Sequence, residues 1–188
     1  MIGIAGAGAF GTALAVAFAR SGREVRLWAR NAEQVRLMRA TRLNESVLPE
    51  VELPENISIH AEIEEISDGQ ALLLAMPMQA LGAALDAWPE IDDRQPLVAC
   101  CKGVDLTTLR GPVAVIEGRR PGAQAAILTG PSFAADIAKG LPTALTLATK
   151  RDGAALQELL STPTLRLYRT DDVIGAELGG ALKNVIAI

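Results

Sequence analysis

Three glycines near the start of the chain have the spacing of a phosphate-binding turn. Gly6, Gly8 and Gly11 belong to the stretch "GAGAFG", which fits the pattern G-x-G-x-x-G. In such a turn the first glycine permits a tight bend, the second lets the backbone approach a pyrophosphate, and the third lets a helix pack close to the sheet. The N–H groups at the start of that helix favour an anion. The spacing indicates a dinucleotide site, although a glycine turn that binds nothing has the same pattern.

Arg30 stands where many dinucleotide folds carry a carboxylate. About 20 residues after the turn, folds that bind NAD often have Asp or Glu, which accepts hydrogen bonds from the ribose hydroxyls. The guanidinium of Arg30 suits a 2′-phosphate instead. The residue type therefore favours NADP over NAD as the cofactor, with a solvated surface arginine as the alternative.

Two polar segments directly follow expected buried strands. Lys102, beside Gly103, can reach a phosphate or polarise a carbonyl from such a position. Residues 129–133 (TGPSF) form a turn into a helix, and the glycine, the hydroxyls and the N–H groups there could hold an anionic substrate. An ordinary surface lysine and an ordinary helix cap are the alternatives.

A further lysine lies in a glycine-rich helix near the end of the chain. The glycines at 175, 179 and 180 cost helix stability, and two of them lie one turn before Lys183. A lysine among apolar neighbours can have a lowered proton affinity, which a proton-transfer residue requires. A lysine that extends from a packed helix into water is the alternative.

Composition excludes several classes of protein. The 188 residues are 49% hydrophobic and carry a net charge of −4, which favours a compact α/β core and argues against a nucleic-acid partner. Cys100 and Cys101 are adjacent and His60 is the one histidine, so we expect neither a disulfide nor a metal site. No basic segment precedes the uncharged residues 2–19, so we expect no signal and no membrane insertion, and a reducing cytoplasm fits best.

Strands and helices alternate around these residues. Short apolar runs predict strands at residues 1–5, 25–28, 57–59, 71–75, 97–101, 125–128, 144–148 and 165–168. Periodic segments predict helices at residues 12–20, 32–41, 79–88, 109–117, 133–139 and 153–160, and residues 44–55 are expected to form a loop. The alternation predicts an α/β fold with a doubly wound, mainly parallel sheet, whose ligands bind outside the carboxyl ends of the strands.

The last helix is expected over residues 173–188, with Asp171 and Asp172 available as caps. It ends in the apolar stretch "KNVIAI" with neither a glycine nor a cap. We therefore expect a dinucleotide-binding domain at residues 1–172, and at residues 173–188 the first helix of a missing helical C-terminal domain.

The chain resembles the NAD(P)-dependent glycerol-3-phosphate dehydrogenases of the bacterial type. The matching stretches are "GAGAFGTALA", "VRLWARN", "AMPMQAL", "CCKGVD", "LTGPSFAADIAKGLPTA" and "GAELGGALKNVIAI", in the family's order. The resemblance implies a Rossmann-type domain and reversible hydride transfer between dihydroxyacetone phosphate and sn-glycerol 3-phosphate, a precursor of glycerophospholipids. It also allows a homodimer formed through the missing domain.

The resemblance assigns the substrate residues. It implies that Lys183 donates or accepts the proton at the substrate oxygen, and that Lys102 contacts both substrate and cofactor. It likewise implies substrate contacts for Gly130 and Ser132.

The resemblance also extends the cofactor site beyond the three glycines. It implies cofactor contacts for Ala9, Phe10, Arg30 and Ala134, although many relatives have tryptophan where Phe10 stands.

Two other functions remain open. One is another two-domain NAD(P)-dependent dehydrogenase that acts on a 3-hydroxy acid with a lysine on a helix. The other is a non-catalytic module that only binds a nucleotide. The "GPSFA" stretch argues against the first, and the presence of both Lys102 and Lys183 argues against the second.

Overall fold

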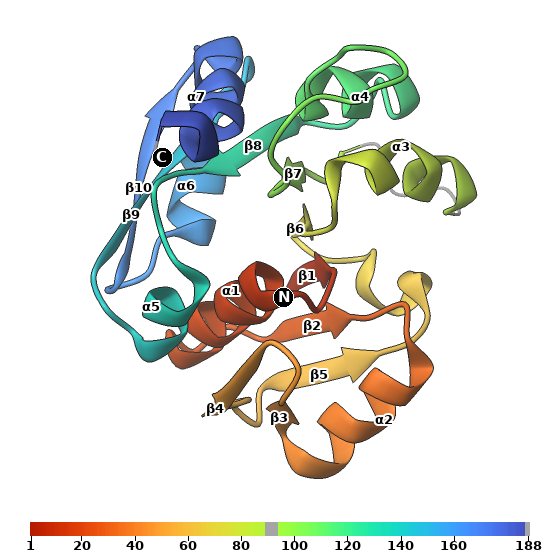
Figure 1. The fold of residues 1–188 in the computed structure, drawn as a ribbon, viewed down its shortest axis with the longest axis vertical. Coiled ribbons are helices and arrows are strands. Elements are labelled where there is room, and N and C mark those ends of the chain that lie inside the picture. Colours follow the sequence, from red (N-terminus) through yellow and green to blue (C-terminus); the bar gives the residue numbers. More distant parts are fainter. Residues whose placement is uncertain (89–93, 187–188) are drawn as a thin grey trace.

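The fold is built around one eight-stranded sheet (Figure 1). The computed structural model describes the backbone of residues 1–88 and 94–186, and the side chains of these residues up to 182. The strand order is β10-β9-β8-β7-β6-β1-β2-β5, and every pair is parallel except β8 with β9. The strands are β1 (Ile2–Ala5), β2 (Val25–Trp28), β5 (Ile57–His60), β6 (Ala71–Leu74), β7 (Leu97–Ala99), β8 (Ala125–Thr129), β9 (Thr143–Ala148) and β10 (Leu165–Thr170). The predicted doubly wound, mainly parallel α/β sheet is confirmed.

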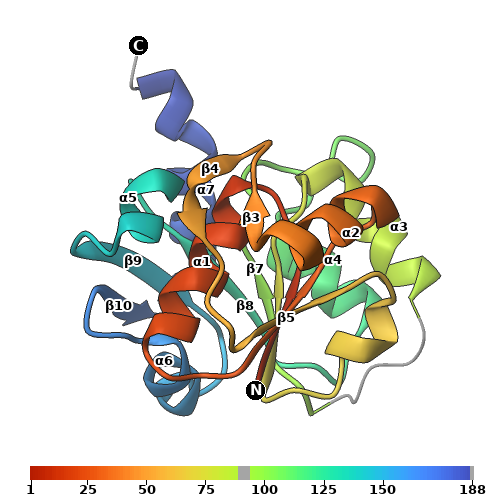
Figure 2. The same ribbon diagram turned by 90° about the horizontal axis from the view of Figure 1, so that it is seen from below.

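Helices cover both faces of the sheet, and each face has its own apolar core. Figure 2 shows α1, α5 and α6 on one side and α3 and α4 on the other. One core contains residues of α1 (Ala9–Arg20), α2 (Ala32–Thr41), α5 (Ala134–Lys139) and α6 (Ala154–Leu160). The other contains residues of the 3-10 helix η1 (Ile63–Ile66), of α3 (Met78–Ala87) and α4 (Pro112–Arg119), and of the start of α7 (Val173–Ile186).

The predicted helix start at Thr12 is wrong, because α1 begins at Ala9 with Gly8 as its N-cap. The close approach of Gly11 to the turn allows this early start. A Cβ on Gly11 would lie 2.0 Å from the carbonyl oxygen of Gly6, so only a residue without a side chain fits there. Gly6 has a φ of +128°, a conformation that favours glycine. The helix therefore starts inside the glycine turn, directly at the end of β1.

The predicted loop at residues 44–55 is also wrong. The segment contains an antiparallel pair of strands, β3 (Leu43–Asn44) and β4 (Leu48–Glu52). Leu48 and Val51 are buried in the same core as α1, and this burial offsets the cost of ordering the segment. Pro49 is exposed on the two-stranded sheet, where its missing N–H breaks no central ladder.

Smaller differences concern the ends of elements. The helix predicted at 109–117 begins at Pro112, because Leu109 has a left-handed φ of +56° and is 75% exposed. The strand predicted at 97–101 ends at Ala99, and the two cysteines after it lie in opposite cores. Burial raises the pKa of both thiols, that of Cys101 to about 12. Both therefore stay protonated near neutral pH and are poor nucleophiles.

No helix in the described ranges is long and apolar enough to cross a membrane.

Gly11→Ala should destabilise the fold by about 1–3 kcal/mol, because the added methyl group would overlap the Gly6 carbonyl. Equilibrium unfolding in urea measures the change. The control is Gly179→Ala on α7, where a Cβ would meet no atom within 4 Å. That variant should keep or slightly raise the free energy of unfolding, since alanine has the higher helix propensity. Equal stabilities for the two variants would contradict the close packing of α1 on the turn.

Candidate functional site

An open cleft of about 690 Å³ lies at the carboxyl ends of β1, β2 and β6. The glycine turn forms one side of it, and the small side chains of α3 form part of another. The rings of Trp28 and Trp88 meet edge to face, with 5.9 Å between their centroids, and both line the cleft. The full lining is Gly6, Ala7, Gly8, Trp28, Ala29, Arg30, Asn31, Gln34, Val47, Ala75, Met76, Pro77, Ala80, Ala83, Ala84, Ala87 and Trp88.

The glycine turn leaves room for an anion in this cleft. Gly8 is exposed, and a Cβ built on it would meet no atom within 4 Å. Gly8 caps α1, whose first N–H groups have no acceptor within the helix. Ala9 and Phe10 form the start of the first turn, which carries no acidic side chain. A pyrophosphate fits this place because the partial positive charge of the helix end is not neutralised there.

Arg30 is exposed two residues beyond the end of β2 and lines the same cleft. Asn31 follows it and caps α2, with its Oδ1 accepting from the N–H groups of Glu33 and Gln34. The Glu33 carboxylate pairs with Arg36, 2.5 Å from its Nη2, so this carboxylate is engaged within α2. Arg30 and the open cleft thus lie side by side after β2.

A second group of polar residues gathers at the carboxyl ends of β7 and β8, beside α7. A Cβ on Gly180 would lie 2.6 Å from Thr129 Oγ1 and 3.9 Å from Lys102 Cγ. The missing side chain of Gly180 thus allows α7 to approach both residues. The hydroxyl oxygens of Thr129 and Ser132 are buried, and neither has a hydrogen-bond partner in the described part of the chain. Two buried hydroxyls without partners indicate a place that a polar ligand could fill.

Gly130 lies in the segment that joins β8 to α5, and Ala134 follows that segment. A Cβ on Gly130 would lie 2.8 Å from Leu145 Cδ2, so this glycine lets the chain pass close to β9. Ala134 is the first residue of α5 and is partly buried. The predicted residues Lys102, Gly130, Ser132 and Ala134 therefore all lie on the same edge of the sheet.

Two hydrogen bonds hold the first half of α7 in place, one at its start and one near its middle. Asp172 accepts from the N–H of Gly175 at 2.8 Å, as the capping prediction expected. Glu177 Oε1 accepts from the N–H of Val113 at 2.9 Å, which ties α7 to the start of α4. Partial burial raises the pKa of this carboxyl group. Lys183 lies on α7 one turn after Gly180, and its side chain lies outside the described residues.

The sequence does not identify two residues that hold the glycine turn in place. Asn44 and Gln34 donate hydrogen bonds to the carbonyl of Ala7 in the glycine turn, at 2.9 and 3.1 Å. Asn44 lies in the segment that the sequence predicts as a loop, where no periodicity marks it. Thr129 belongs to the segment 129–133 that the sequence already indicates as a candidate anion site. Among the described residues no group of His, Cys, Asp and Glu could hold a metal ion.

Comparison with known proteins finds one family over most of the chain. The profile described as "NAD-dependent glycerol-3-phosphate dehydrogenase N-terminus" matches residues 1–155. A glycerol-3-phosphate dehydrogenase [NAD(P)+] of Cereibacter sphaeroides is 57% identical over the full chain, and one of Ruegeria sp. is 51% identical. The chain covers 57% and 59% of these two relatives.

A solved structure shows the same fold. The crystal structure of a glycerol-3-phosphate dehydrogenase from Coxiella burnetii superposes with a TM-score of 0.92 and 33% sequence identity. The match covers 99% of this chain and 58% of that one.

Gly8→Val should abolish binding of NADPH by this chain while leaving it folded. The valine side chain would extend into open space, so it disturbs no packing, but it would occupy the place that a pyrophosphate needs. Calorimetric titration measures binding, and thermal unfolding checks the fold. Gly179→Val on α7 is the control, because its surroundings are also open. Normal affinity in Gly8→Val would show that the glycine turn has only a structural role.

Proposed function

Because the chain belongs to the family of NAD-dependent glycerol-3-phosphate dehydrogenases, we propose that it supplies the cofactor-binding part of such an enzyme. The proposed reaction is hydride transfer between NAD(P)H and dihydroxyacetone phosphate, which gives sn-glycerol 3-phosphate. One observation carries the proposal. The open cleft beside Gly8 and the polar group around Lys102 and Thr129 both lie at the edge of the sheet where the parallel strands have their carboxyl ends. Cofactor and substrate can therefore meet at that edge.

The first task of the chain is to hold and orient the cofactor. The turn at Gly6–Gly11 and the first N–H groups of α1, at Ala9 and Phe10, would bind the pyrophosphate. Arg30 would bind the 2′-phosphate of NADP, and Ala134 at the start of α5 would pack near the cofactor. When bound, NAD(P)H supplies the hydride.

The second task is to hold the substrate and to move a proton. In the direction of reduction the carbonyl carbon gains a hydride and the carbonyl oxygen gains a proton. Lys102 would contact substrate and cofactor, and Gly130 with the Ser132 hydroxyl would hold the substrate. Lys183 would donate the proton to the oxygen, and would take it back in the reverse reaction. The protein thus controls position and protonation, on which the rate depends strongly.

We further propose that residues 1–172 form the dinucleotide-binding domain and that α7 is the first helix of a second, helical domain. The apolar stripe on α7 supports this division. Ile174, Leu178 and Leu182 recur at four-residue spacing and are 68%, 50% and 46% exposed. A stripe of this kind is typical of a helix face that packs against another element.

The remaining proposals follow from the family. The partner is a small phosphorylated substrate, the product serves glycerophospholipid synthesis, and the reaction takes place in the cytoplasm. A homodimer would form through the second domain.

The direct test of the proposed function is oxidation of NADPH by dihydroxyacetone phosphate, followed by absorbance, with the longer protein that contains this chain. A panel of 3-oxo acids serves as the comparison. Turnover of the phosphate substrate alone supports the proposal. Turnover of a 3-oxo acid instead, or binding of NADPH without any turnover, would contradict it.

Arg30→Ala should remove a preference for NADPH over NADH. A charge-assisted contact with a phosphate contributes about 1.5–3 kcal/mol, or about tenfold to a hundredfold in affinity. Titration of the chain and of the variant with both cofactors measures the ratio of the two dissociation constants. A variant that keeps the preference, or a chain that binds both cofactors equally, would exclude this role for Arg30.

Lys183→Ala in the longer protein should lower kcat by about 10²–10⁴-fold, the usual contribution of a proton-transfer residue. The affinity for NADPH should stay nearly the same, because the cofactor cleft lies on other elements. Steady-state kinetics and calorimetry measure the two effects separately. A near-normal kcat would remove Lys183 from the mechanism.

A further inference from the structure

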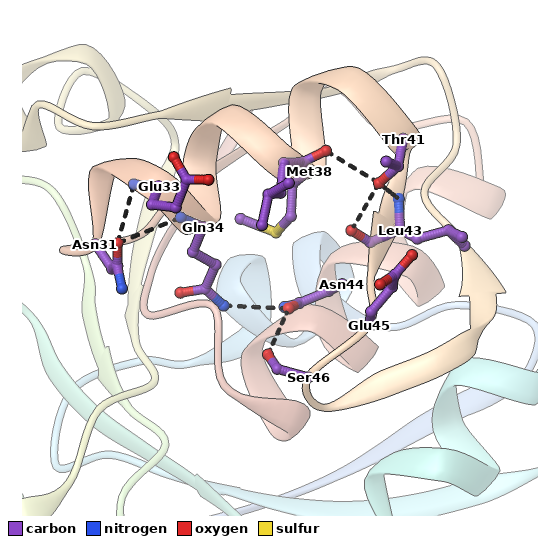
Figure 3. A pocket seen from close by; sticks show the side chains of 10 residues that line it. Asn31, Glu33, Gln34, Met38, Thr41, Leu43, Asn44, Glu45 and Ser46 are labelled. Carbon is purple, nitrogen blue, oxygen red and sulfur yellow. Dashed lines mark hydrogen bonds between the residues drawn. The ribbon is translucent and has the colours of Figure 1, made fainter.

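The carbonyl group of Ala7 lies in the middle of the glycine turn and is held from outside the turn. It accepts one hydrogen bond from Asn44 Nδ2 on β3, at 2.9 Å, and one from Gln34 Nε2 on α2, at 3.1 Å. Figure 3 shows Gln34 and Asn44 facing each other at one end of a pocket of about 550 Å³ between α2 and β3. Two elements that are distant in sequence from the turn therefore determine where this carbonyl points.

The amide of Asn44 is fully used in this network. Its Nδ2 also donates to Thr12 Oγ1 on α1 at 2.9 Å. Its Oδ1 accepts from Gln34 Nε2 at 3.1 Å and from Ser46 Oγ at 3.3 Å. Asn44 is only 2% exposed, and a buried amide that loses one of these partners pays the cost of an unsatisfied polar group. The side-chain amide of Asn44 therefore has one favourable orientation.

The held carbonyl also orients the next N–H group. In a trans peptide bond the C=O of one residue and the N–H of the next point in opposite directions. Because the Ala7 carbonyl points toward Asn44, the N–H of Gly8 points away from it. On the exposed side of Gly8 lies the open space where the pyrophosphate is expected. Glycine has little conformational preference of its own, so the turn needs such an external restraint.

We propose that Asn44 is a positioning residue for the dinucleotide, which acts through the Ala7 carbonyl to present the Gly8 N–H to the pyrophosphate. This inference rests on the proposed function of the cleft. Asn44 lies behind the turn and is not among the residues that line the cleft, so it acts without touching the ligand. Its effect on binding passes through one peptide group.

Asn44→Ala should weaken the binding of NADPH about tenfold or more, since a charged acceptor would lose a preoriented donor. The control is Asn56→Ala, which removes an asparagine of the same kind that also donates to backbone carbonyls. Asn56 Nδ2 donates to the carbonyls of Ala19 and Arg23, both at 2.8 Å, near the C-terminal end of α1, which is the end far from the glycine turn. Asn44→Ala loses four side-chain hydrogen bonds and Asn56→Ala loses two, so both should lower the unfolding temperature. Only Asn44→Ala should change the affinity measured by calorimetry.

A second ligand separates positioning from a general loss of structure. Adenosine 2′-monophosphate can contact Arg30 but has no pyrophosphate, so its affinity should be the same for the chain and for Asn44→Ala. Asn44→Ser, which keeps a donor in a smaller side chain, should recover part of the NADPH affinity. If Asn44→Ala does not fold, Asn44→Ser with weaker NADPH binding and unchanged monophosphate binding gives the same support.

Three results would overturn the assignment. The first is a folded Asn44→Ala variant with normal NADPH affinity. The second is an equal loss of NADPH affinity in Asn44→Ala and Asn56→Ala. The third is an equal loss for NADPH and the monophosphate. Failure of the unsubstituted chain to bind NADPH or NADH would instead overturn the proposed function of the cleft, and this inference with it.

Discussion

The close contact between Gly11 and the carbonyl oxygen of Gly6 is the constraint on which the site depends. A side chain at residue 11 would stand 2.0 Å from that oxygen, and its absence lets α1 begin inside the turn that leaves β1. The helix end and its N–H groups are thereby directed at the carboxyl edge of the sheet. The helix N-terminus favours an anion through its backbone alone, because the first turn of α1 contributes no charged side chain.

Glycines lie where two elements come close together, and polar side chains nearby fix the orientation of those elements. Gly180 admits α7 to the hydroxyl of Thr129, while Glu177 ties the same helix to the first turn of α4. In the glycine turn, Asn44 and Gln34 perform the holding role. Small residues thus set the distances between elements, and buried hydrogen bonds set their orientation.

The two polar groups share one edge of the sheet because the strands that carry them are parallel. β1, β2, β6, β7 and β8 all end on the same side, so residues far apart in the chain meet there. The sheet order places β6 and β7 between the glycine turn and Thr129, and the alanine-rich α3 leaves the cleft open. This arrangement brings the cleft and the group around Thr129 to one edge of the sheet.

The sequence alone determined the order of the eight strands of the main sheet and of the seven α-helices in the described part of the chain. It also determined the glycine turn and the positions of Arg30 and Lys102, because each has a local pattern of spacing or strand-end placement. It did not reveal the β3–β4 pair, since short strands with Pro49 give no clear period. The start of α1 at Ala9, the role of Asn44 and the close approach of Gly180 to Thr129 were decided only by the tertiary structure. Their contacts join residues that are distant in the chain, and such contacts leave no periodic trace in the sequence.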